Sequence, residues 1–316
     1  MMGGSGINDR GVGGLRAMIG AGLRGLSRYT GTLFAVFLVQ SLIAAACTAG
    51  VAIVLAQAFA HLPMFDEAVD GQLVALIWVM RHARGTFVAI GGIVFAAIVL
   101  WQLATWFLAG GVYGVLAERP EGRGGTARCF GASGATTYLA YARLAVCSLP
   151  GWALVLTVFG GCLGMVMPRI EHALSMSDLI GPLAFSLVPA LALLHFFWTV
   201  SDYARVELTL RRDTHDPGVL ATYLRSLVYV ARRPLTLVHG ALGWVFFALI
   251  TLAYAYLAQG HSMYGAEGAV TLFVARHGVA LLRMALHIAI MAGQIELGRT
   301  RPLPPLHVEV KADDNT

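Results

Sequence analysis

Six predominantly apolar stretches, each of at least about 20 residues, run through the 316-residue chain. An α-helix of ~20 residues spans the ~30 Å hydrocarbon core of a bilayer. Inside that core every backbone polar group needs a partner within the protein, which a helix supplies by itself. The sequence therefore predicts an all-α polytopic membrane helical bundle with six transmembrane helices, over residues 33–58, 87–113, 146–167, 183–203, 238–258 and 273–297. A shorter apolar run over 73–80 predicts an interfacial helix.

The composition excludes several classes of protein. Hydrophobic residues make up 58% of the chain and charged residues 12%, whereas soluble domains have about 45–50% and about 25%. So few charges cannot cover a soluble enzyme, a disordered chain or a nucleic-acid-binding module, and we expect no nucleic-acid partner despite the net charge of +5. No catalytic motif and no metal-ligand spacing occurs, so we expect no enzyme activity, no metal and no cofactor.

The arginines and lysines predict the orientation. If the six stretches cross the membrane, 17 of the 22 Lys and Arg residues fall on one side and four on the other. Positive residues collect in cytoplasmic loops, so both termini are predicted to lie in the cytoplasm, with the protein in the inner (plasma) membrane. This path divides the chain into a basic amphipathic segment (1–30), a six-span domain (31–298) and a Pro-containing cytoplasmic tail (299–316).

A basic stretch precedes each odd-numbered span, which suggests three hairpin units, each introduced by an amphipathic in-plane helix. Leu15, Ile19, Leu23 and Leu26 share one face before the first span, and Val219, Tyr223, Leu227 and Val230 share one before the fifth. The stretch 126–143 is a weaker example. This recurrence of a basic stretch before every second span has two explanations. The hairpin unit was duplicated, or any six-span protein with basic cytoplasmic loops shows the same pattern. Basic residues of such helices bind anionic headgroups, and the candidates are Arg16, Arg24, Arg28, Arg225, Arg232 and Arg233.

Small residues recur four apart within the spans, a spacing that lets helix backbones approach closely. The pairs include Gly110/Gly114 and Gly160/Gly164, and the sixth span carries Ala285, Ala289 and Gly293. Pro150 and Pro189 predict kinks in the third and fourth spans.

Polar residues inside two spans predict a seam between them. At about 100° per residue, one face of the sixth span carries Arg276, Arg283, His287 and Gln294, and one face of the fourth carries His195, Thr199 and Asp202. Ionisable groups at bilayer depth face a bundle interior or a water-filled cavity. The seam is therefore either a proton or solute path, since histidine titrates near neutral pH, or structural bonding between helices.

The stretch Ser201-Asp202-Tyr203-Ala204-Arg205-Val206-Glu207, followed by a basic helix up to Arg233-Pro234, resembles uncharacterised multi-pass bacterial membrane proteins. These are distantly similar to the membrane domain of some glycerophosphodiester phosphodiesterases, and the resemblance covers about residues 106–234. It implies a bacterial inner-membrane bundle of unknown activity. The soluble catalytic barrel of those enzymes has no counterpart in the sequence, so no hydrolase activity carries over. Asp202 and Arg205, three apart on a helix, are predicted to form an interfacial clasp.

Three functions remain from the sequence, and the third of them, a membrane enzyme that acts on lipid, is disfavoured because no carboxylates or metal ligands cluster on one side. The first is a non-catalytic membrane module that binds lipids, a second membrane protein or another copy of the chain. The alternative is a transporter or permease subunit that uses the His/Arg/Asp seam between spans four and six.

Overall fold

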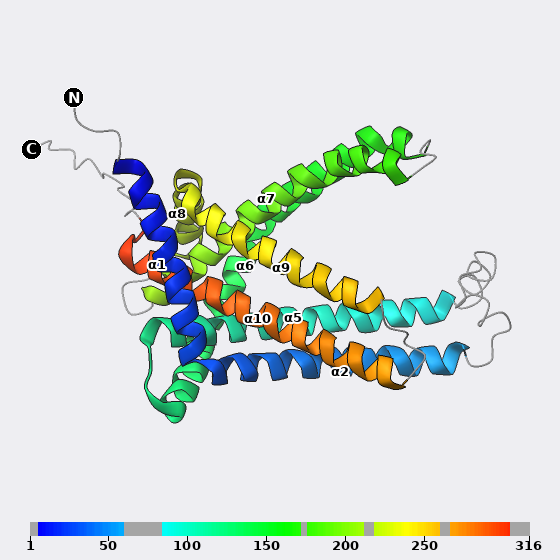
Figure 1. Ribbon diagram of the computed structural model, residues 1–316, viewed down its shortest axis with the longest axis horizontal. Coiled ribbons are helices and arrows are strands. Elements are labelled where there is room, and N and C mark those ends of the chain that lie inside the picture. Colours follow the sequence, from blue (N-terminus) through cyan, green and yellow to red (C-terminus); the bar gives the residue numbers. More distant parts are fainter. Residues whose placement is uncertain (1–5, 60–83, 172–175, 212–217, 260–265, 304–316) are drawn as a thin grey trace, which may run out of the picture. The chain divides into compact units, whose positions relative to one another are not determined.

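The computed structural model describes residues 6–59, 84–171, 176–211, 218–259 and 266–303. Within these ranges every regular element is an α-helix (Figure 1). The expected interfacial helix over 73–80 lies outside the described residues, as does most of the Pro-containing tail.

Six of the helices are long and apolar enough to cross a membrane, which confirms the six predicted spans. The protein is thus a multi-pass membrane protein with an all-α fold. Each helix extends past the apolar stretch that predicted it, because the flanking polar residues continue its hydrogen-bonding ladder. The six are α2 (Thr30–Phe59), α5 (Arg84–Glu118), α6 (Gly122–Glu171), α7 (Met176–Leu210), α9 (Pro234–Gln259) and α10 (Ala266–Thr300).

Two further helices precede spans: α1 (Gly6–Arg28) leads into α2, and α8 (Val219–Arg232) leads into α9. Tyr29 separates the first pair. Pro234 opens α9, because a proline fits the first turn of a helix but cannot continue one. The third expected in-plane helix, over 126–143, is not a separate element. It forms the first part of α6, which continues without a break through Pro150 and Pro168 to Glu171.

The chain forms two compact units. Unit 2 is Phe34–Leu108 and holds most of α2 and α5. A Cβ placed on Gly50 would lie 3.5 Å from Ile93, so the two helices approach each other there. Unit 1 comprises Met1–Leu33 and Ala109–Thr316, and it contains every candidate functional residue.

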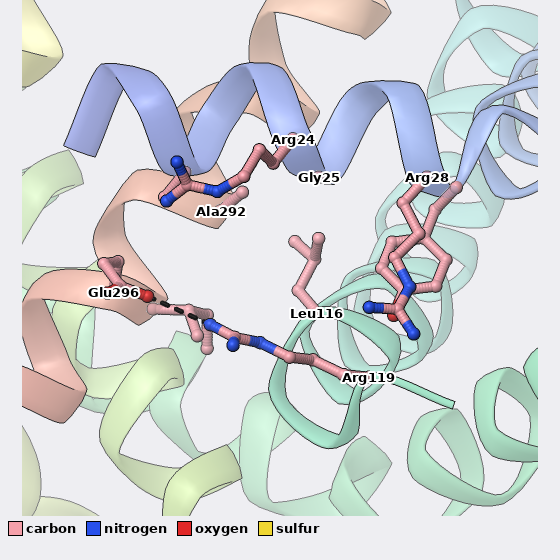
Figure 2. Close-up of a pocket in the computed structure, with 10 residues that line it drawn as sticks. Arg24, Gly25, Arg28, Leu116, Arg119, Ala292 and Glu296 are labelled. Carbon is pink, nitrogen blue, oxygen red and sulfur yellow. Dashed lines mark hydrogen bonds and ion pairs between the residues drawn. The ribbon is translucent and has the colours of Figure 1, made fainter. Parts of the chain in front are cut away.

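In unit 1, α1 packs along α10 through glycines. A Cβ on Gly22 would lie 2.7 Å from the Ala289 carbonyl oxygen, and one on Gly25 would lie 2.9 Å from the Ala292 Cβ (Figure 2). Larger residues at these positions would hold the two backbones apart. The close crossing places the arginines of α1 beside the end of α10.

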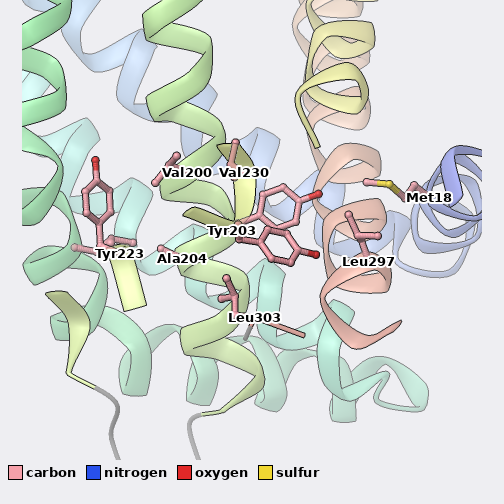
Figure 3. Packing of buried hydrophobic residues seen from close by; sticks show 10 residues of the cluster. Met18, Val200, Tyr203, Ala204, Tyr223, Val230, Leu297 and Leu303 are labelled. Atoms are coloured by element: carbon pink, nitrogen blue, oxygen red, sulfur yellow. The ribbon is translucent and has the colours of Figure 1, made fainter. Parts of the chain in front are cut away.

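The core of unit 1 lies where α1 and α8 meet the spans. Tyr203 of α7 packs on Tyr229 of α8 with ring centroids 5.4 Å apart (Figure 3). We call this region the packed end; it consists of α1, α8 and residues 109–148, 195–210, 234–243 and 285–303. The remaining parts of α6, α7, α9 and α10 are the outer halves. The main buried cluster comprises Met18, Leu144, Val200, Tyr203, Ala204, Tyr223, Tyr229, Val230, Leu297 and Leu303.

Candidate functional site

The structure brings together one residue from each side of the predicted seam. The Gln294 side-chain amide of α10 donates a hydrogen bond to Asp202 Oδ2 of α7, at 3.3 Å. Both side chains are buried. Asp202 Oδ1 also accepts a hydrogen bond from Arg205 Nη1 at 3.0 Å, so the two residues of the expected clasp are paired.

This pair is the centre of a wider buried network. The Tyr113 hydroxyl of α5 donates to Gln294 Oε1 at 3.0 Å. The Tyr141 hydroxyl of α6 donates a hydrogen bond to the backbone carbonyl oxygen of Arg205 at 3.2 Å. The same hydroxyl lies 2.7 Å from the Thr209 hydroxyl. Side chains from α5, α6, α7 and α10 are therefore joined at one level of the packed end. The network bonds helices together, and its Asp202 carboxylate has two donors.

The other two residues that the seam predicted on α7, His195 and Thr199, lie against α9 instead of α10. His195 Nε2 donates to the Leu237 carbonyl oxygen at 2.9 Å. A Cβ on Gly240 would lie 2.7 Å from the His195 ring, so this glycine leaves the space that the ring needs. Thr199 donates to the His195 carbonyl oxygen of its own helix, at 2.8 Å.

The remaining residues on the α10 face are exposed. Arg276, Arg283 and His287 all have high accessibility. The Arg283 guanidinium carbon lies 3.9 Å from the centroid of the Phe247 ring of α9. The seven predicted residues thus do not form one continuous seam, because His195 bonds to α9 and the side chains of Arg276, Arg283 and His287 are exposed.

An ion-pair cluster that the sequence analysis missed lies between α7 and α8. Glu207 is only 3% exposed. Arg211 Nε lies 2.5 Å from its Oε1 and Arg225 Nη2 lies 3.9 Å from it. The sequence did hold a signal for this cluster: Glu207 is an acidic residue among the arginines at the end of a span. A carboxylate that is buried there requires a cationic partner.

The expected lipid-facing position of Arg225 is wrong: its residue is 7% exposed and it faces Glu207. Helix α8 is rotated from the expected orientation, since Leu220, Leu224 and Val228 are exposed. Both faces of α8 carry apolar residues, and the buried carboxylate decides which of them packs inward. The buried side is Thr222, Tyr223, Arg225, Ser226, Tyr229 and Val230.

The other basic candidates of these two helices are accessible to differing degrees. Arg16, Arg24, Arg28 and Arg232 are exposed. Arg233 is half-buried, and it donates to the Tyr229 hydroxyl at 3.1 Å. On α1, the apolar residues Ile19 and Leu23 are also exposed, because Met18 and the glycines take the contacts with the bundle.

A basic pocket of about 210 Å³ lies between α1, the end of α5 and α10. Three arginines contribute to it: Arg24 and Arg28 from α1, and Arg119 from the turn after α5 (Figure 2). One acidic residue, Glu296, also lines it and accepts a hydrogen bond from Arg119 Nη2 at 3.1 Å. The full lining is Ala21, Arg24, Gly25, Arg28, Tyr29, Leu116, Arg119, Ala292, Ile295 and Glu296.

Tyr29 lines this pocket, and its hydroxyl is buried. Burial raises the pKa of Tyr29 above its usual value, although Arg28, Arg119 and Arg299 act in the opposite direction. The phenol therefore stays protonated at neutral pH and can donate. Within the described part of the chain its hydroxyl has no hydrogen-bond partner. Three guanidinium groups and a free phenol hydroxyl, against one carboxylate, favour the binding of an anion.

A second cavity, of about 920 Å³, lies between the outer halves of α6 and α7. Its charged lining residues are Arg169 and Asp178, which have opposite charges. The basic pocket thus has a surplus of positive charge that this cavity lacks.

Among the described residues no group of three His, Cys, Asp or Glu side chains could hold a metal ion. No family model, no curated protein and no solved structure matches the chain. The resemblance to the membrane domain of the phosphodiesterases therefore stays a prediction.

Proposed function

We propose that the protein is a non-catalytic module of the bacterial inner membrane that binds anionic lipid headgroups through its packed end. The observation that carries this proposal is the group of arginines on α1 and around the basic pocket, of which Arg16, Arg24 and Arg28 are exposed. A basic residue near an anionic membrane surface contributes about 1 kcal/mol to attraction. The exposed Ile19 and Leu23 on the same helix support insertion of its apolar side at the interface.

The orientation follows from the same charges. With the packed end on the cytoplasmic side of the membrane and both termini in the cytoplasm, the arginines of α1 and α8 face the leaflet that carries most anionic lipid. The outer halves then cross the hydrocarbon, where their exposed apolar side chains meet lipid tails, another membrane protein or a second copy of the chain.

Lipid-dependent stability tests this function. The full chain is placed in nanodiscs of phosphatidylcholine alone or with about one third phosphatidylglycerol, and its free energy of unfolding is compared. We expect higher stability in the anionic discs. Replacing Arg16, Arg24 and Arg28 together with glutamine should remove up to about 3 kcal/mol of that difference. Equal stability of the unchanged protein in both discs would contradict the proposal.

Transport is the second candidate, supported by the buried charges of Asp202, Glu207 and Arg225, because ionisable groups inside a membrane often mark a path. The pairing of Asp202 with Arg205 and Gln294 favours the structural alternative. A proton-flux assay in liposomes distinguishes them: flux in the unchanged protein that is lost in Asp202→Asn would support transport.

A further inference from the structure

We infer that the basic pocket binds one phosphate group. This inference rests on the proposed function and deepens it, since it replaces a diffuse attraction to the membrane surface by a defined site. Phosphate oxygens prefer guanidinium groups, which donate parallel hydrogen bonds in a planar fork.

Two of the donors have fixed relative positions on one helix. Arg24 and Arg28 are four residues apart on α1, so their side chains lie on the same face. Figure 2 shows both side chains bordering the pocket, with the Arg119 side chain on the side away from α1. Arg24 is free to lie along its own helix, because Gly20 beneath its Nη1 has no side chain.

The third arginine is held by the end of α5. Arg119 has a φ of 55°, in the left-handed region that disfavours residues with a Cβ. This conformation ends the helix, and it places the side chain where it can reach Glu296 on α10. Glu296 thereby fixes Arg119. The lining keeps two positive charges in excess, from three arginines and one glutamate.

Tyr29 provides the observation that is independent of the arginines. The residue is 6% exposed, lines the pocket, and has a hydroxyl without a partner among the described residues. A buried polar group without a hydrogen-bond partner destabilises the folded state. The Tyr29 hydroxyl is buried beside the pocket, so a small shift of the phenol would bring it to a phosphate oxygen there, which would accept its hydrogen bond.

The size of the pocket suits a headgroup. Its volume of about 210 Å³ is more than ten times the ~10–15 Å³ that a cavity needs to hold one water molecule. Tyr29 directly precedes α2, a candidate span that begins at Thr30, so the pocket lies at the level where a membrane helix begins. Two sources can supply the phosphate: the headgroup of a phospholipid, or a soluble phosphate.

The test measures lipid binding to the full chain in mild detergent by native mass spectrometry. Phosphatidic acid is the anionic probe and phosphatidylcholine the zwitterionic one. We expect Arg28→Gln to weaken phosphatidic acid binding at least about tenfold and Tyr29→Phe several-fold, as for hydrogen bonds to charged groups. Arg16→Gln is the matched control, since Arg16 is exposed on the same helix but does not line the pocket. Because Arg16 contributes only to the general attraction between the basic surface and anionic lipid, its effect should stay at or below about fivefold and be smaller than that of Arg28→Gln.

The outcomes separate this inference from the proposed function. If Arg16→Gln and Arg28→Gln weaken binding equally, the pocket is overturned, whereas general attraction to anionic lipid survives. If the unchanged protein binds phosphatidic acid and phosphatidylcholine equally well, both the phosphate site and the proposed function are overturned. Inorganic phosphate that displaces phosphatidic acid at millimolar concentration would support the site with a soluble phosphate as its source. If phosphate does not displace phosphatidic acid, and Arg28→Gln weakens its binding, a lipid headgroup is the source.

Arg119→Gln provides a second variant, and size-exclusion profiles check that each variant is folded.

Discussion

The packed end and the outer halves of unit 1 are built from the same helices but differ in what holds them together. At the packed end, side chains from four spans share buried hydrogen bonds, and glycines bring α1 against α10. In the outer halves, large apolar residues such as Leu156, Val188 and Leu252 are more than 60% exposed. Lipid tails are as apolar as leucine, so apolar contacts do not drive helices together in a membrane. Association requires close backbone approach or polar bonds, and both occur mainly at the packed end.

Removing the central carboxylate gives the largest expected effect. Asp202→Ala leaves the buried Gln294 amide without this acceptor and Arg205 without its ion pair. Breaking a buried pair costs about 3–5 kcal/mol; because Arg205 is 21% exposed, we expect about 2–3 kcal/mol. The measurement is the free energy of unfolding in a mixed-micelle titration.

Arg283→Leu is the counterpart in the outer half. The arginine is exposed and contacts the Phe247 ring, and an exposed cation–π pair contributes about 0.5–1 kcal/mol. Its replacement should therefore change stability by less than about 1 kcal/mol. A larger effect for Arg283→Leu than for Asp202→Ala would reverse the comparison between the two regions.

The next prediction compares the loss of stability when leucine replaces a glycine at the packed end, Gly114, and one in an outer half, Gly164. A Cβ on Gly114 would clash with the Ser133 side chain, whereas nothing lies within 4 Å of one on Gly164. We expect Gly114→Leu to cost about 1–3 kcal/mol through overpacking. Gly164→Leu should be neutral or slightly stabilising, because glycine is a poor helix former. Thermal unfolding of the two variants in the same detergent measures this difference, and equal losses would show that the outer half of α6 is also packed.

These glycines also show how far the sequence predicts the fold. Apolar length was sufficient for the six spans, because lipid imposes that length on any spanning helix. The pairs Gly110/Gly114 and Gly160/Gly164 have the same local pattern, yet the first pair faces Ser133 and Thr137 of α6 and the second faces open space. Which pair is used depends on where another helix lies, and that information is absent from the local sequence.

The candidate site was predictable to a similar degree. Helical periodicity placed Asp202 and Gln294 on the polar faces of the fourth and sixth spans, which were predicted to meet. It did not reveal that α9 would take the His195 contact, or that Glu207 would turn Arg225 inward. The basic pocket was missed because Arg119 comes from the turn after α5, about 90 residues from α1 in the sequence. The pattern of neighbouring residues in the sequence does not show that two such distant segments meet in the fold.

The smallest expected effect distinguishes hydrogen bonding from burial within the packed end. Tyr113→Phe removes the donor to Gln294 and should cost about 1 kcal/mol at neutral pH. Tyr223 is also buried, but its hydroxyl has no partner among the described residues. Tyr223→Phe should thus change stability by less than about 0.5 kcal/mol, or raise it. If both variants lose the same free energy of unfolding, burial of the ring alone accounts for the contribution of each tyrosine.

Alkaline pH adds a second measurement on Tyr223. Burial raises the pKa of this phenol above its usual value, so the folded state favours the protonated form. Its contribution to stability is fully present below the unfolded pKa of about 10 and is lost as the pH rises through the higher folded value. Tyr223→Phe should therefore make the fall in unfolding free energy above pH ~10 shallower, with little change at pH 7. An unchanged slope would mean that solvent already reaches the hydroxyl, and that α8 packs less tightly against the spans than the rest of the packed end.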